Sequence, residues 1–257
     1  MYYTKRKRVI KLPNREVDFG TWDLRDFIAP RCYATVAVFA HAWGRYSELY
    51  AKNPDYMCKV EKLIGLDNII IKEMWNVVNV MIKYRGDDPV FQTPDFWQLP
   101  NETWGMGKGD CEDTTFLLVS AIRGFKPDAK VYATLGLYID PYTKNVYGHA
   151  WGIYKARFYN GWLWLESTLE NALSQSVWLA WNPEYLVPVY WFNECEAYRV
   201  DRDYRFLGLD EKYVEKHRGL IEQMIDYVET GKWTKVKWMH KGRRVPVLLS
   251  TLVVPVA

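Results

Sequence analysis

The chain contains 257 residues with a net charge of +3 at pH 7, and 49% of them are hydrophobic. This composition excludes an intrinsically disordered chain and predicts a folded globular protein, because it supplies enough apolar surface to form a core. The small net charge argues against a nucleic-acid partner.

The first 30 residues are predicted to form an irregular N-terminal arm, because Pro13, Gly20 and Pro30 interrupt a mixture of basic, aromatic and acidic residues. The basic cluster at residues 5–8 is interpreted as solvated. No apolar segment of the kind found in secretory signals follows it, and no run of the sequence has the length of a membrane span. We therefore expect a cytoplasmic protein without a membrane partner.

Helices are predicted over most of the chain before residue 85. Apolar residues recur at helical spacing over 33–50, and a second helical region covers 54–84 with a break at 65–68. His41 falls on the first helix and is interpreted as a buried structural histidine, since no nucleophile or acid pattern surrounds it.

Residues 85–109 are predicted to be a long loop, because they are dense in Pro, Gly and Asp. Loops of this length inside a compact domain usually carry function. Trp97, Gln98 and Trp104 are candidates to line a cleft or to donate to an oxyanion, through an amide or an indole N–H. The alternative is that these three side chains anchor the loop on the core.

The next stretch, GKGDCEDTTFLL, places Cys111 at the start of a predicted helix over 111–123. Unpaired N–H groups at a helix start stabilise a thiolate and can donate to an oxyanion. Asp110, Glu112 and Asp113 are interpreted as helix-capping acids, with a calcium site as the alternative. No other metal or cofactor is expected. The acids oppose a thiolate, so a cationic partner for the cysteine is required.

That partner is predicted to be His149, which lies in the strand-like segment VYGHAWGIY. The following segment, GWLWLEST, is predicted to be the next strand, and it ends in Glu166. A cysteine, a histidine and an acid in this order supply a nucleophile, a general base and an orienting carboxylate. Pairing of the two strands about a turn at 159–161 would place Glu170 near His149 as well, and both acids remain candidates.

These segments resemble the three sequence blocks of the transglutaminase-like cysteine peptidase superfamily, particularly its bacterial and archaeal branch. The similarity covers roughly residues 80–170. It implies a papain-like α+β core, with a helical N-terminal part and a catalytic helix packed on an antiparallel sheet. It also implies a triad of Cys111, His149 and Glu166. The family usually has aspartate in the third block, and glutamate must reach the imidazole by a different rotamer.

The resemblance implies a cysteine peptidase or amidase that acts on a peptide or protein amide through a thioester. A cross-linking transglutaminase and a non-catalytic structural or assembly protein are the alternatives. We expect residues 31–200 to form the catalytic domain and 201–257 to extend it. The apolar tail at 245–256 is interpreted as a buried strand or as an interface with a second copy or an assembly partner.

The remaining features have structural interpretations. Residues 210–230 are predicted to be an amphipathic helix on which His217 occupies the charged, solvated side. Cys32, Cys58 and Cys195 are interpreted as small core residues, because no spacing typical of a zinc site or a disulfide framework is present. Aromatic residues make up 16% of the chain, and most are expected in the core.

Overall fold

The structure is a computed structural model that describes residues 5–12, 15–86, 96–168, 177–230, 237–238 and 252–255. Its main sheet consists of β5 (Val131–Ile139), β6 (Val146–Tyr154), β7 (Leu163–Leu165), β8 (Val177–Ala180), β9 (Leu186–Phe192), β10 (Ala197–Arg199), β11 (Lys237–Trp238) and β12 (Leu252–Pro255). The strands follow the order β10-β9-β5-β6-β7-β8-β12, and every neighbouring pair in this order is antiparallel. β11 pairs with β6 in parallel.

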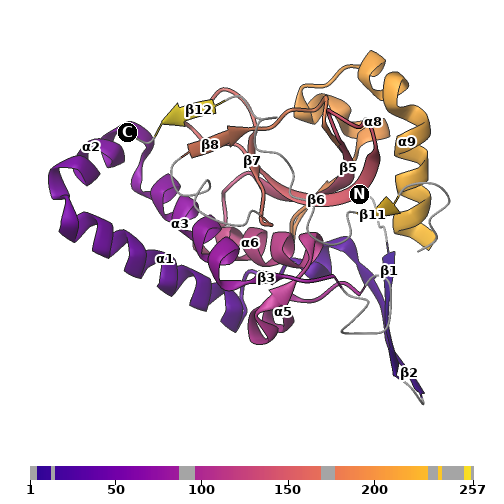
Figure 1. The fold of residues 1–257 in the computed structure, drawn as a ribbon, viewed down its shortest axis with the longest axis horizontal. Helices are drawn as coiled ribbons and strands as arrows, with labels where there is room; N and C mark the ends of the chain where they lie inside the picture. The colour runs from indigo at the N-terminus through magenta and orange to yellow at the C-terminus, as the bar shows by residue number, and fades with distance from the viewer. Residues whose placement is uncertain are drawn as a thin grey trace.

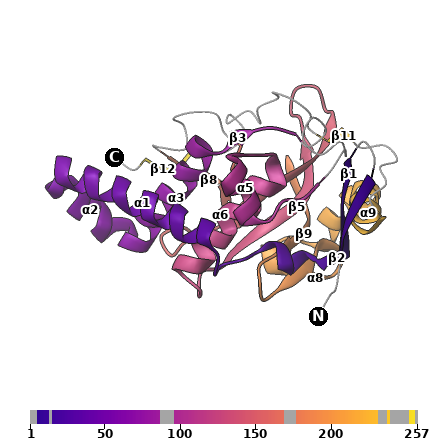
Figure 2. The same cartoon turned by 90° about the horizontal axis from the view of Figure 1, so that it is seen from below.

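The helices are α1 (Tyr33–Lys52), α2 (Pro54–Ile64), α3 (Leu66–Met81), α5 (Pro100–Met106), α6 (Cys111–Phe125), α8 (Val200–Asp203) and α9 (Glu211–Thr230). Two short 3-10 helices, Leu24–Phe27 and Tyr204–Leu207, complete the helical elements of the described residues. In Figure 1 and Figure 2, α1, α2 and α3 form one end of the molecule and α9 lies at the other. The chain therefore has the predicted α+β class, with helices preceding an antiparallel sheet.

α6 lies at the centre of the fold. It contacts β5 and β6 on one side and α1, α3 and α5 on the other. Every residue from its start to Arg123 is buried. A helix enclosed in this way is apolar on most faces, and its few polar side chains need hydrogen-bond partners inside the protein.

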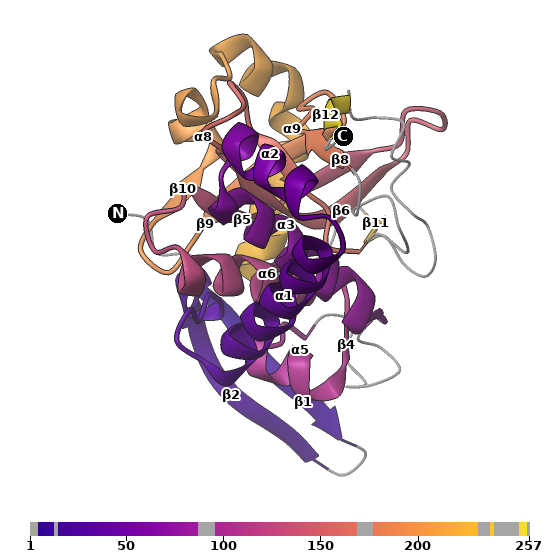
Figure 3. The same ribbon diagram turned by 90° about the vertical axis from the view of Figure 1, so that its left-hand side faces the viewer.

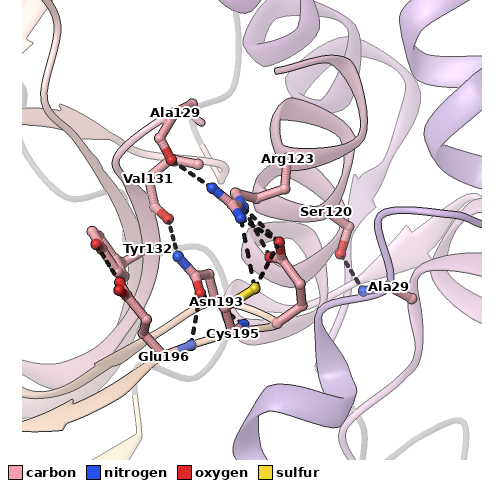
Figure 4. A network of polar contacts seen from close by, with 10 residues as sticks. Ala29, Ser120, Arg123, Ala129, Val131, Tyr132, Asn193, Cys195 and Glu196 are labelled. Carbon is pink, nitrogen blue, oxygen red and sulfur yellow. Dashed lines mark hydrogen bonds and ion pairs between the residues drawn. The ribbon is translucent and has the colours of Figure 1, made fainter. Parts of the chain in front are cut away.

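A polar network fixes the C-terminal end of α6 (Figure 4). Arg123 donates from Nε to both carboxylate oxygens of Glu194, at 2.8 and 2.9 Å, and from Nη1 to the carbonyl of Ala129 at 2.9 Å. Asn193 accepts the N–H groups of Cys195 and Glu196, each at 2.9 Å. The network connects α6 to the turn between β9 and β10, so the position of the helix on the sheet is fixed at this end.

The N-terminal residues form a hairpin, so the prediction of an irregular arm is wrong. β1 (Lys5–Leu12) pairs antiparallel with β2 (Arg15–Asp23). The hairpin projects from the body of the molecule (Figure 3). The prediction failed because buried and exposed cations alternate over residues 5–8, and a hydrophobicity pattern counts every cation as exposed.

Two arginines of the basic cluster are buried by aromatic rings. Arg8 is 3% exposed, and its guanidinium lies 4.7 Å from the ring centre of Phe96. It also donates to the carbonyl of Trp97 at 2.9 Å and to Glu102 at 2.6 Å. Arg6 is 7% exposed and lies 4.9 Å from the ring centre of Trp97. Only the other two cations of the cluster, at positions 5 and 7, are solvated as expected.

The segment before α6 contains regular structure instead of a continuous loop. α5 occupies residues 100–106, with Pro100 at its first position, where the missing N–H costs no hydrogen bond. β3 (Lys83–Tyr84) pairs in parallel with β4 (Lys108–Gly109), directly before α6. A helix of seven residues is too short for periodicity to reveal, and residues 87–95 lie outside the described part of the chain.

Two histidines and one cysteine occupy environments opposite to those expected. His41 is exposed on α1, whereas His217 is 6% exposed on α9. Cys195 is exposed, and Cys32 and Cys58 are half-buried. The aromatic prediction is confirmed for six tryptophans that are fully buried: Trp75, Trp97, Trp151, Trp164, Trp178 and Trp191.

Two further expectations concern membranes and the C-terminal tail. No helix in the described ranges is both long and apolar enough to cross a bilayer. β12 pairs antiparallel with β8, as expected for a strand in the tail. The other tail residues lie outside the described part of the chain, so an interface there stays a prediction.

Lys72 on α3 is a buried lysine that should make the fold sensitive to pH. It is 5% exposed, and its ammonium lies 4.0 Å from the ring centre of Trp75 and 5.2 Å from that of Trp178. Burial lowers the pKa of Lys72 from its ordinary value of 10.5 to about 7, although the negative charge of Glu73 acts to raise it. Between these two pH values only the unfolded chain holds the proton, so stability rises with pH in that interval.

Lys72→Met should therefore raise the free energy of unfolding at pH 7 by on the order of 3 kcal/mol. The gain should shrink as the pH approaches 10. Urea unfolding of both proteins at pH 7, 8.5 and 10 measures the difference, and Lys62→Met on the exposed side of α2 is the matched control. Parallel stability curves for wild type and Lys72→Met would contradict the prediction.

Candidate active site

Cys111 is the first residue of α6 and is 3% exposed. The start of the helix is organised by Asp113, which is fully buried. Its Oδ1 accepts the backbone N–H of Gln98 at 2.7 Å, and its Oδ2 accepts the side-chain amide of Gln98 at 2.6 Å and the N–H of Asp110 at 3.3 Å. A Cβ at Gly109 would lie 2.7 Å from Cβ of Asp113, so only glycine lets this carboxylate reach the helix start.

His149 lies in the middle of β6 and is fully buried. Its Nε2 is 2.7 Å from Oε2 of Glu166. An ionised carboxylate can only accept, so it fixes the ring proton on Nε2 and leaves Nδ1 as an acceptor. No hydrogen-bond partner of Nδ1 is found among the described residues. Leaving a buried polar atom unpaired costs about 1–3 kcal/mol, which is expected where a substrate or a reacting group completes the site.

Strand register explains why Glu166 reaches His149. Gly152 pairs with Leu165 across β6 and β7, so continuing the register places Glu166 opposite Trp151. Side chains two apart on a strand share a face, and Glu166 is therefore a diagonal neighbour of His149. The extra methylene of glutamate is accommodated, as the 2.7 Å contact demonstrates. Glu170 lies outside the described residues.

Every oxygen of Glu166 has a defined partner. Its Oε1 accepts the N–H of Thr168 at 3.0 Å and the hydroxyl of Thr168 at 2.6 Å. Its backbone carbonyl accepts the indole N–H of Trp75 at 2.7 Å and the amide of Asn79 at 3.2 Å. Donors directed at a buried carboxylate hold its orientation. α3 thus helps to position Glu166 through its backbone carbonyl.

Ser167 connects the acid to the helix that bears the cysteine. Its hydroxyl lies 2.9 Å from the hydroxyl of Thr114 and 2.9 Å from that of Thr115. Both threonines belong to the first turns of α6. The segment after β7 and the start of α6 are therefore bound to each other beside Cys111 and Glu166.

Gly136 gives the histidine strand the space that it needs. It pairs directly with His149 across β5 and β6. A Cβ at this position would lie 2.7 Å from Cη2 of Trp151 and 2.2 Å from the carbonyl oxygen of Val187. The Trp151 ring is stacked near the imidazole, with ring centres 5.9 Å apart. Any larger residue at 136 would displace the ring that supports His149.

The surroundings of Cys111 favour the neutral thiol. Burial raises the pKa of Cys111 well above its ordinary value, and the charges of Glu112 and Asp110 raise it further. The thiol donates to Oε2 of Glu112 at 3.2 Å. The backbone N–H of Ala150, the residue after His149, acts in the opposite direction and lowers the pKa. β6, the strand that carries His149, contacts α6, whose first residue is Cys111.

Tyr84 is a site neighbour that sequence reasoning missed. It is half-buried on β3, and its backbone pairs with Gly109. Burial raises the pKa of Tyr84, and the charges of Cys111, Asp110, Glu112 and Glu166 raise it further. Its phenol therefore stays a neutral O–H donor, on a strand that pairs with the residues just before Asp110. Only its position before the long segment could have indicated this role, since β3 contains two residues.

The three expected cleft residues have defined packing and hydrogen-bond partners in the structure. Trp97 is 1% exposed and packs edge-on against Phe27 and Phe116 in the core. Trp104 is half-buried with its ring centre 5.7 Å from that of His41. Gln98 is 2% exposed, and its side-chain amide donates to Asp113. The structure thus gives the alternative interpretation for Trp97 and Trp104, which anchor their segment on the core.

The three acids at the helix start form a potential cation site. Asp110, Glu112 and Asp113 each offer a carboxylate oxygen, and these oxygens lie within 4.8 Å of one another. Three hard oxygen ligands suit calcium in chemistry. Both oxygens of Asp113 already accept N–H groups, as a capping residue requires. The three carboxylates are thus suitable ligands for calcium, and the hydrogen bonds of Asp113 are those of a helix-capping residue.

Four further residues of the site were not singled out from the sequence: Trp75, Asn79, Ser167 and Thr168. The last two directly follow Glu166 in the motif LEST, so the signal was present as a hydroxyl pair beside an acid. Trp75 and Asn79 are one helical turn apart on α3. Their role depends on tertiary packing, which a local pattern does not contain.

No protein-family model matches the sequence, and no curated protein is significantly similar to it. Among solved structures, the chain is similar to LapG of Legionella pneumophila with a TM-score of 0.41 and 18% identity, over 74% of this chain and 97% of that chain. EGTA-treated LapG gives the same values. Calcium-bound LapG gives a TM-score of 0.41 and 18% identity over 70% and 98% of the two chains. A similarity this remote carries no argument about activity, and membership of the superfamily that the motifs resemble stays a prediction.

Proposed function

We propose that this protein is a cysteine-dependent amide hydrolase in which Cys111 is the nucleophile, His149 the general base and Glu166 the acid that orients His149. The observation that carries the proposal is the buried bond between His149 and Glu166, which leaves Nδ1 of the imidazole unpaired among the described residues. The contact between β6, which carries His149, and α6, which begins with Cys111, supports it. The substrate is a peptide or protein amide.

The chemistry follows from the tautomer that Glu166 imposes. Nδ1 of His149 takes the thiol proton, and the resulting imidazolium offsets the negative charge of Glu112 and Asp110 beside the thiolate. The thiolate attacks the amide carbonyl, and N–H groups at the start of α6 stabilise the oxyanion. His149 then gives its proton to the leaving amine, and a thioester remains on Cys111.

The acceptor of the acyl group decides between two activities. Water, deprotonated by His149, releases a carboxylic acid and regenerates the thiol, which is hydrolysis. A lysine amine would instead give an isopeptide bond, which is the transamidation reaction of a transglutaminase. We favour hydrolysis, because the sequence resembles the prokaryotic branch of the superfamily. A calcium ion held by Asp110, Glu112 and Asp113 would offset the charge that raises the pKa of Cys111.

A non-catalytic protein is the second candidate, and one observation favours it. The thiol of Cys111 is buried and donates to Glu112, which is also how an inert structural cysteine is held. In that case the thiol of Cys111 stays protonated, as its raised pKa favours. In a hydrolase the same thiol is activated when its proton passes to His149.

Alkylation by iodoacetamide across pH 5–10 separates the two candidates. If His149 activates the thiol, Cys111 should react at pH 7 at least about tenfold faster in the wild type than in His149→Gln. The site of modification is read by peptide mass spectrometry, because Cys195 is exposed and also reacts. Equal rates in the two proteins, with Cys111 no faster than glutathione at any pH, would remove the activated nucleophile.

Tyr84 is proposed as the side-chain donor to the oxyanion. Tyr84→Phe should lower kcat by about 10- to 100-fold with little change in KM, because a donor to the oxyanion acts in the transition state. Hydrolysis of a mixture of fluorogenic peptide amides gives both constants. Tyr142→Phe is the matched control, since this tyrosine is 69% exposed. A change confined to KM would assign Tyr84 to substrate binding instead.

A further inference from the structure

A cavity of about 560 Å³ opens at the opposite end of α6 from Cys111. Its walls come from the start of α3, the connection between α6 and β5, and the connection between β6 and β7. α6 has 15 residues, so the cavity is about 22 Å from the cysteine along the helix axis. It is therefore separate from the proposed hydrolytic site.

Two lysines face each other at the rim of this cavity. Val131 pairs with Tyr154, and the next residues outward are Lys130 and Lys155. The N–H of Lys155 donates to the carbonyl of Lys130 at 2.9 Å, which continues the antiparallel register by one position. Like charges directly opposite each other across two strands destabilise the pair. Arg157 lies two residues further along the same wall and adds a third positive charge.

None of these three cations forms a salt bridge with a carboxylate in the part of the chain that the structure describes, although the charge of Arg157 contributes to lowering the pKa of Asp128. The ammonium of Lys155 has the ring of Trp162 at 5.9 Å, and Lys130 and Arg157 are exposed. Lys126 differs, because its ammonium lies 3.0 Å from Asp128 and 3.6 Å from Asp67. Four cations and two acids line the cavity, so an excess of positive charge remains.

An anion would remove the repulsion between the three cations. Lysine and arginine side chains around a shared space are the usual ligands of phosphate groups. Phe158 and Tyr159 are half-buried in the same lining and offer ring surface to an organic group. The volume of about 560 Å³ lies within the range typical of sites for small organic ligands.

We propose that this cavity binds a phosphate-bearing small molecule of nucleotide size, with its phosphates on Lys130, Lys155 and Arg157. The organic part lies against Phe158 and Tyr159. The proposal does not depend on the hydrolytic function, because the two sites are at opposite ends of α6.

Isothermal titration calorimetry with ATP, pyrophosphate and adenosine at low ionic strength tests this assignment. ATP should bind saturably and more tightly than pyrophosphate, and adenosine should not bind. The affinity for ATP should fall as salt is added. The double variant Lys130→Met and Lys155→Met should weaken ATP binding at least tenfold, whereas Lys59→Met on the exposed side of α2 should not.

The double variant removes a repulsive pair, so its unfolding temperature should equal or exceed that of the wild type. Two results would overturn the proposal: no saturable binding of ATP up to millimolar concentration, or equal binding by a folded double variant. Pyrophosphate binding as tightly as ATP would overturn the assignment of a nucleotide-sized ligand.

Discussion

Replacement of Cys111 by alanine should abolish amide hydrolysis, with a fall in rate on the order of 10⁴-fold or more. The proposed thioester cannot form without the sulfur, and the oxyanion donors and binding groups alone leave only residual catalysis. The loss is measured with the mixture of fluorogenic peptide amides. Transfer of a dansylated alkylamine onto casein should fail in the same variant, because both activities need the acyl-enzyme.

A loss of activity is informative only if Cys111→Ala folds. The thiol is 3% exposed and has a hydrogen bond to Glu112, so its removal should cost about 1 kcal/mol of stability. Urea unfolding monitors this cost. Cys195→Ala is the matched control, because this exposed cysteine lies in the turn between β9 and β10, at the other end of α6. Full activity of Cys111→Ala, or an equal loss in Cys195→Ala, would exclude Cys111 as the nucleophile.

The central helix could be predicted because local and tertiary signals agree there. Asp110 precedes the helix, acids occupy its first turn, and apolar residues follow on most faces. The strands of His149 and Glu166 were also predictable, since both are apolar and end in turn residues. The exact acid was not, because a shift of one residue in register reverses the face on which every side chain lies.

Other features required contacts between distant segments. The basic residues at 6 and 8 are covered by the aromatic rings of Trp97, Phe96 and Tyr227, which lie about 90 and 220 residues away in the sequence. His217 is buried beside Tyr213 although its neighbours in sequence are charged, with ring centres 4.7 Å apart. A local pattern predicts that such residues are exposed, whereas tertiary contacts bury them.

The same limit applies to the candidate site. The motif containing Glu166 identified an acid, but the donors to its backbone carbonyl come from α3, which lies some 90 residues earlier in the chain. Trp97 and Trp104 looked like cleft residues because they lie in a loop-like segment before the nucleophile. The structure instead uses both rings as packing surface, since a segment that holds α5 in place needs its own apolar anchors.

Glu166→Gln should lower kcat by about 10³- to 10⁴-fold while leaving the fold intact. The amide of glutamine can donate to Nε2 of His149, which an ionised carboxylate cannot. The ring proton would then move to Nδ1, and the atom that must accept the thiol proton would be blocked. ¹⁵N chemical shifts of the imidazole report the tautomer directly, and a merely structural role of Glu166 would not change them.

Two companion variants sharpen this test. Glu166→Asp keeps the charge but withdraws the carboxylate by one methylene, so His149 should keep its proton on Nε2 while kcat falls less than in Glu166→Gln. Glu170→Gln should leave both kcat and the tautomer unchanged if Glu166 orients the base. The reverse result, with loss of activity in Glu170→Gln and an unchanged Glu166→Gln, would transfer the orienting role to Glu170, because the proposed mechanism requires one carboxylate to fix the tautomer.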